Sequence, residues 1–162
     1  MKTHKDLVNN ILIRLREREV SSVNETSYSK LISVFVNDAK DFVESAWNWS
    51  ALRETLTVVT QEDVFNYVLT DAGNNLVVLD IVNSTGDNFL SYKDPHWFNN
   101  VFLNNTPAKG NPTYYVFNGV SGAGDTQVDL YPVPNAAYTI YFNVIKRSQA
   151  LVEEADVIHI PH

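Results

Sequence analysis

Apolar residues in the first part of the chain recur with the period of an α-helix. Over residues 4–19 they gather on one face, while Arg and Glu side chains occupy the opposite face. Thr3 is placed to cap this helix, and Asp6 in its first turn is favourable to the helix dipole. A second helix is predicted from about residue 26 to residue 47. Its apolar stripe consists of Tyr28, Leu31, Ile32, Phe35, Ala39, Phe42, Val43 and Ala46, and Val36 and Trp49 widen it. A stripe this broad can contact both the protein's own sheet and a neighbouring molecule.

After Ser50 the pattern changes to the alternation that is typical of β-strands. Runs rich in Val, Ile, Thr and aromatic residues are separated by short turn sequences, which favours antiparallel hairpins. Asp94-Pro95 predicts the start of one short helix near residues 95–104, because Asp is a good cap and Pro suits the first helical position. The expected strands cover residues 52–59, 65–69, 76–82, 89–92, 113–117, 126–131 and 138–144, with a short strand or extended tail at 157–160.

The pattern therefore predicts the α+β class. We expect an N-terminal helical hairpin over residues 1–50, followed by an antiparallel β-sheet or sandwich domain over residues 51–162 that carries one short inserted helix.

The charge balance limits the classes of partner. The chain carries 19 acidic and 12 basic residues and a net charge of −7, which argues against tight nucleic-acid binding, since that depends on Lys and Arg at phosphates. An acidic wall that repels DNA would still let DNA slide past. The absence of cysteine excludes disulfides and thiolate metal sites. The N-terminal stretch is amphipathic, so we expect neither a signal peptide nor a membrane span.

No motif indicates catalysis. His159 and His162 form the only close histidine pair, but Pro161 disfavours a shared helical face and no third metal ligand is indicated. The glycine-rich stretch 119–124 lacks the Lys-Ser/Thr ending of a phosphate loop and lies between two predicted strands, so a hairpin loop is expected. The carboxylate pairs fall in polar linkers. We therefore expect no catalytic residue, no metal and no cofactor.

Six segments, in their order and spacing, resemble the head-to-tail adaptor family of short-tailed, podovirus-type bacteriophages, also called connectors or tail tubular protein A-like proteins. Together they span nearly the whole chain. They are VNETSYSKLI (23–32), WNWSALR (47–53), YKDPHWFNN (92–100), GNPTYY (110–115), VDLYPVP (128–134) and IHIPH (158–162).

The resemblance implies a structural virion protein without chemistry of its own. It implies a homo-oligomer, a dodecameric ring in the neck of the virion, made in the host cytoplasm and without contact to a membrane. The helical part would face the portal protein and the β domain the tail nozzle, with genomic DNA passing through the channel without specific binding. In that family a helical region usually follows the Ile-Pro-His motif. The sequence ends at His162, so docking on the portal through such a region stays an expectation.

A closed ring of identical subunits needs head-to-tail interfaces, so each subunit should have two adhesive lateral faces. Under this interpretation, Phe35→Asp or Phe42→Asp should abolish folding or assembly. The candidate interface residues are Arg14, Arg18, Tyr28, Phe35, Phe42, Trp97, Phe98 and Phe102.

Other classes remain open. The chain could be another phage neck or tail protein, such as a tail terminator, which would differ in the partner that it binds. It could be a carbohydrate-binding β module that uses Trp47, Trp49 or Trp97 as a stacking platform. For Trp47 and Trp49, a buried joint between the helices and the sheet is the expected alternative. A hydrolase that uses scattered Asp and Glu residues is the third class.

Overall fold

The computed structural model describes residues 2–159 and divides into two compact units. The helical unit comprises the chain up to Leu52 together with the described residues from Arg147 onward. The β unit comprises residues Arg53–Lys146. The expected division at residue 50 grouped residues 147–162 with the strands, whereas the structure groups the described part of that segment with the helices.

The first helix, α1 (His4–Arg14), begins as expected and ends earlier. The Thr3 side chain accepts the Asp6 backbone N–H, and the Asp6 carboxylate accepts the Thr3 N–H, which together form a capping box. The helix was expected to reach residue 19. It ends at Arg14 because Arg16 adopts a left-handed backbone (φ 62°), and the N–H of Glu17 closes the end on the Leu12 carbonyl.

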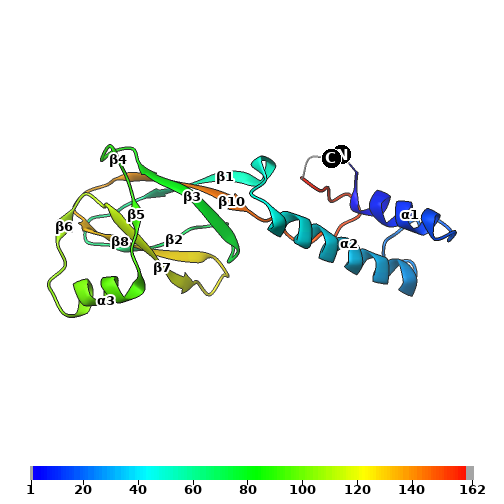
Figure 1. The fold of residues 1–162 in the computed structure, drawn as a ribbon, viewed down its shortest axis with the longest axis horizontal. Coiled ribbons are helices and arrows are strands. Elements are labelled where there is room, and N and C mark those ends of the chain that lie inside the picture. Colours follow the sequence, from blue (N-terminus) through cyan, green and yellow to red (C-terminus); the bar gives the residue numbers. More distant parts are fainter. Residues whose placement is uncertain (1, 160–162) are drawn as a thin grey trace. The chain divides into compact units, whose positions relative to one another are not determined.

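The second helix, α2 (Ser27–Ala46), has the expected bounds and is capped by Thr26. A short 3₁₀ turn (Ser50–Leu52) follows it. The two helices lie side by side in the helical unit (Figure 1). Their shared core consists of Val8, Leu12, Val20, Val23, Ile32, Val36 and Leu151.

The buried face of α2 is not the expected apolar stripe. Of the eight main residues in that stripe only Ile32 is buried, and the others are exposed to solvent; Val36, which widens the stripe, is buried as well. The buried positions recur every three or four residues, as one face of a helix requires, and are Ser29, Ile32, Val36, Lys40 and Glu44. Two of them carry charge, so a prediction from hydrophobicity alone turned the helix the wrong way.

The buried charges of α2 hold the C-terminal segment. The Lys40 and Glu44 side chains are fully buried and lie 3.4 Å apart. The Lys40 ammonium donates to the Ser148 carbonyl at 2.9 Å, and the Glu44 carboxylate accepts both the N–H and the hydroxyl of Ser148. One turn earlier, the Asn37 carboxamide accepts the Leu151 N–H and donates to its carbonyl. We call this set of five residues the polar clamp.

The same C-terminal segment satisfies the start of α1. The N–H groups of His4 and Lys5 donate to the carbonyls of Asp156 and Glu154, groups that a helix leaves unpaired at its N-terminus. The buried His4 ring donates from Nδ1 to the Glu153 carbonyl, because a carbonyl can only accept, and its Nε2 lies 2.9 Å from Ser33 Oγ. The segment therefore connects both helices.

The β unit contains two four-stranded sheets, in the orders β1-β10-β3-β4 and β2-β8-β7-β5, and a small β6-β9 pair. Most pairs are antiparallel as expected, but β5–β7 and β6–β9 pair in parallel. The elements are β1 (Arg53–Val59), β2 (Asn66–Val68), β3 (Leu76–Asn83), β4 (Asn88–Phe89), β5 (Ser91–Tyr92), α3 (Pro95–Leu103), β6 (Lys109–Gly110), β7 (Tyr114–Val120), β8 (Thr126–Tyr131), β9 (Val133–Pro134) and β10 (Thr139–Lys146).

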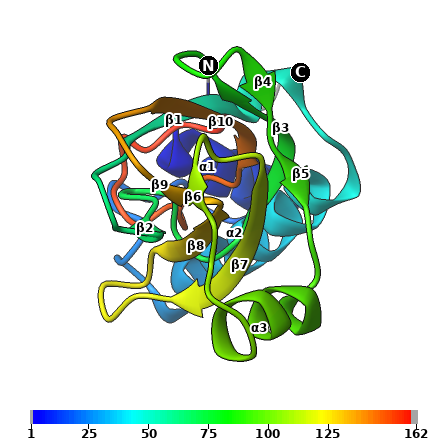
Figure 2. The same ribbon diagram turned by 90° about the vertical axis from the view of Figure 1, so that its left-hand side faces the viewer.

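Both four-stranded sheets contribute to a single apolar core. Alternate residues of β1, β8 and β10 supply most of it, in the alternation that the sequence predicts. The inserted helix α3 starts at Pro95 with Asp94 as its cap, as expected, and lies next to β7 (Figure 2). The α+β class with one inserted helix is thus confirmed. The main core side chains are Leu56, Val58, Ile81, Ile140, Phe142 and Val144 from one sheet and Val128 and Leu130 from the other.

One carboxylate of the β unit is buried without a cation. Asp129 on β8 is 8% exposed, and its two oxygens accept the carboxamide N–H groups of Asn66 and Asn118 from the strands on either side. Burial raises the pKa of Asp129 above its usual value, and the two hydrogen bonds only partly offset this effect.

We predict that Glu44→Ala destabilises the helical unit by about 3–5 kcal/mol, because the Lys40 ammonium stays buried without its carboxylate. Urea unfolding followed by circular dichroism measures the loss. Asp41→Ala is the matched control: Asp41 contacts the same ammonium from an exposed position, so its loss should cost less than about 1 kcal/mol. Equal losses for the two variants would contradict the role of the clamp.

A second prediction concerns pH. Because the folded-state pKa of Asp129 is raised, the folded protein binds this proton more tightly than the unfolded chain does. The contribution of Asp129 to stability should therefore grow as pH falls from neutral through the raised pKa towards the unfolded value. The measurement is the free energy of unfolding at pH 7 and pH 5 for the wild type and for Asp129→Asn. The variant should gain less on acidification, and an identical pH response would exclude this account.

Candidate interaction surface

The helical unit exposes an apolar surface along α2. Phe42 is 75% exposed and Phe35 58% exposed, which is unusual for Phe in a folded domain. We call this set the α2 surface: Tyr28, Leu31, Val34, Phe35, Phe42, Val43 and Trp47. An apolar patch of this kind marks a site of interaction in a soluble protein.

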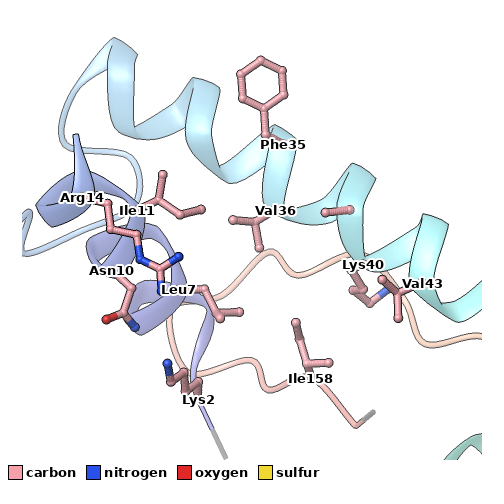
Figure 3. Close-up of a pocket in the computed structure, with 11 residues that line it drawn as sticks. Lys2, Leu7, Asn10, Ile11, Arg14, Phe35, Val36, Lys40, Val43 and Ile158 are labelled. Atoms are coloured by element: carbon pink, nitrogen blue, oxygen red, sulfur yellow. The ribbon is translucent and has the colours of Figure 1, made fainter. Parts of the chain in front are cut away.

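Beside the α2 surface lies a groove between α1 and α2, with a volume of about 680 Å³. Val36 and Ile11 point towards one another across it, with Leu7 close by and Phe35 at its outer edge (Figure 3). Ala39 and Val43 line it further along α2, and Ile158 closes one side. Its walls are therefore mainly aliphatic, which suits an apolar side chain of a partner.

The charged groups at this groove are all cationic. Lys2 and Arg14 line it from exposed positions. Lys40 also lines it, but its ammonium is buried and forms an ion pair with Glu44 in the polar clamp. The residues that form the groove include no Asp or Glu. The groove is thus a locally basic site on an acidic chain.

Arg14 and Arg18 were both expected at an interface, and the structure separates their surroundings. Arg14 lines the groove. Arg18 lies in the loop after α1 and forms a 2.9 Å ion pair with Glu25. The hydrogen bonds of Ser21 to Glu25 hold the pKa of this carboxyl below its usual value. Arg18 therefore takes part in an exposed loop network rather than in the groove.

Trp97, Phe98 and Phe102 were expected at an interface, but Phe98 is 4% exposed. Trp97 and Phe102 are half-buried. The three rings pack on Tyr131 with centroid distances of 5.2, 6.4 and 5.9 Å. These contacts hold α3 against its sheet, because edge-to-face packing of aromatic rings stabilises beyond the area that the rings bury. Sequence alone could not separate this use from a partner surface.

Trp47 and Trp49 do not form the expected buried joint. Trp47 is 70% exposed. The Trp49 indole N–H donates to the Val43 carbonyl near the end of α2 at 2.9 Å, which turns the chain back along its own helix. The tryptophan that reaches solvent therefore extends the α2 surface.

Within residues 2–159 no three His, Asp or Glu side chains gather where they could hold a metal ion. His162, one half of the histidine pair, lies outside the described residues. The glycine-rich stretch joins β7 to β8, which confirms a hairpin loop. In the same part of the chain no helix is both long and apolar enough to span a bilayer.

Comparison with known proteins assigns the chain. The family model described as SU10 adaptor protein matches residues 2–162. The chain belongs to the SU10 adaptor protein family. It is thus a phage head-to-tail adaptor, as the six sequence segments predicted, from a family of structural virion proteins. No curated protein matches it significantly.

The hydrophobic pattern of the adaptor's sequence did not predict all of the residues of the α2 surface and the groove. Val34 lies outside the predicted apolar stripe, and Leu7 and Ile11 were expected only on the apolar face of the first helix. The groove forms because α1 packs against Val36 and leaves the neighbouring positions of α2 uncovered. The signal available in the sequence was the excess of apolar residues on α2, more than one buried face can use.

We predict that Phe42→Asp leaves the adaptor folded. The side chain makes no contribution to a core, so the free energy of unfolding should change by less than about 0.5 kcal/mol. Val36→Asp, six positions earlier on the buried face, should destabilise by several kcal/mol because it buries a carboxylate among aliphatic side chains. Thermal unfolding of the two variants measures this contrast. A collapsed Phe42→Asp variant would show that this position is covered in the monomer.

Proposed function

We propose that this adaptor forms a closed ring in the virion neck, between the portal protein and the tail nozzle, around the channel through which DNA passes. The observation that carries the proposal is the α2 surface, an exposed row of large apolar side chains on a folded helical unit. Membership of a phage adaptor family supplies the setting.

The arrangement of apolar groups suits a ring. Identical subunits close into a ring when one patch on each subunit binds a different patch on the next. The helical unit offers two adjoining patches, the groove between α1 and α2 and the part of the α2 surface that does not line it, which consists of Tyr28, Leu31, Val34, Phe42 and Trp47. Both are built on rigid helices, so little conformational entropy is lost when they are covered.

The charge of the chain supports a passive relation to DNA. A net charge of −7 repels the phosphates of DNA overall. We propose that DNA passes the ring without specific binding, and that the adaptor acts by its shape and contacts, without catalysis or a cofactor. The portal would be met by the helical unit and the nozzle by the β unit.

The test is the mass of the purified adaptor, by light scattering and native mass spectrometry, with and without a candidate portal protein. We expect a closed ring, or a monomer that assembles into a ring on the portal. Phe42→Asp, folded but altered on the α2 surface, should form neither. A wild-type chain that stays monomeric at high concentration and ignores the portal would contradict the proposal.

A further inference from the structure

The two patches of the helical unit have unlike shapes and opposite charges. If the adaptor forms the proposed ring, this difference between the patches identifies which surfaces meet in it. One patch is the groove, apolar with a basic rim. The other is a projecting row on α2, which we call the ridge: Leu31, Val34, Asp38 and Phe42.

The ridge is one continuous face of the helix. Its members are three, four and four residues apart, so they lie above one another on α2. All four are exposed. The groove is lined by other positions of the same helix, Phe35, Ala39 and Val43, which lie directly beside the ridge. None of the four ridge residues lines the groove, so a copy can present its ridge while its own groove receives another.

The shapes are complementary. Ridges of side chains along one helix pack into the grooves beside another, which is the usual way in which helices associate. The groove volume of about 680 Å³ can receive several side chains of the size of Leu31, Val34 and Phe42. Its aliphatic walls match these side chains in polarity.

The charges are complementary as well. Arg14 and Lys2 line the groove, and neither forms an ion pair among residues 2–159. Asp38 stands in the middle of the ridge and likewise has no ion-pair partner within the described chain. Its neighbour Asp41 is already engaged by the Lys40 ammonium at 3.1 Å. Asp38 is thus the acid available to a basic rim.

We propose that the ridge of one adaptor copy occupies the groove between α1 and α2 of the next copy, with Asp38 paired to Arg14 across the interface. The contact joins two different patches, so it propagates head to tail and closes by rotation instead of ending at a dimer. The occupant is a second copy because both halves of the match, apolar and ionic, are present on this one chain.

Charge reversal tests the pairing. Arg14→Asp and Asp38→Arg each place like charges at every interface, which should raise the concentration needed for assembly, on the portal or without it, by at least about tenfold. The double variant Arg14→Asp with Asp38→Arg restores opposite charges and should assemble as the wild type does. Glu62→Arg is the control, since it makes the same charge change on an exposed residue of the β unit and should have no effect. Circular dichroism checks that each variant is folded.

Cross-linking gives an independent test, which the absence of native cysteine makes clean. Asn10→Cys lies in the groove and Val34→Cys on the ridge. The double variant Asn10→Cys with Val34→Cys should form disulfide-linked oligomers of many copies under mild oxidation, seen as a ladder of bands on a non-reducing gel. Val34→Cys alone should stay uncross-linked, because ridges do not meet one another.

The outcomes separate the two proposals. Rings that ignore both charge reversals, or that give no ladder, overturn the ridge-and-groove contact and leave the ring itself standing. A ladder and a rescue by the double variant support the contact. A wild-type chain that never assembles, alone or on the portal, overturns the ring and with it this contact. A portal that binds the groove while rings form without it would also exclude a second copy as the occupant.

Discussion

The return of the chain from the last strand to the helices is the constraint on which the helical unit depends. Residues 147–158 are not held mainly by apolar burial, since only Leu151 among them is buried in the helical core and Ile158 packs against that core partly buried. They are held by the polar clamp and by the first turn of α1, through backbone groups that each find a specific partner. A buried ion pair adds little net stability by itself, but it admits only one arrangement of its surroundings. The clamp thus fixes the register of α2, that is, which face of the helix is turned towards the interior.

That register decides which part of α2 reaches solvent. Because Lys40, Glu44 and Asn37 must face the C-terminal segment, the apolar row that includes Phe35 and Phe42 is turned outward. The opposite rotation of α2 about its axis would have buried the aromatic side chains and exposed the charged ones. The helical unit therefore exposes an apolar surface to solvent. Exposed apolar patches of this kind are typical of surfaces that a partner covers. The interior of the unit and the surface that it exposes are therefore set by the same interaction.

The β unit is organised differently. Its two sheets enclose an aliphatic and aromatic core, and α3 is attached through ring-to-ring contacts on Tyr131. Asp129 between Asn66 and Asn118 is the exception, a carboxylate that joins three adjacent strands without a cation.

The sequence by itself determined the class of the fold, most of the element positions and the family. These follow from local rules: the period of apolar residues, the capping of α1 and α2 by Thr3 and Thr26, and the Asp94-Pro95 start of α3. It could not determine which face of α2 is buried, because that depends on hydrogen bonds to Ser148 and Leu151, more than a hundred residues away. For the same reason the groove beside Arg14, and the burial of Phe98, emerged only when distant segments were brought together. Hydrophobicity ranks residues one at a time, whereas burial is decided by the partner that each one meets.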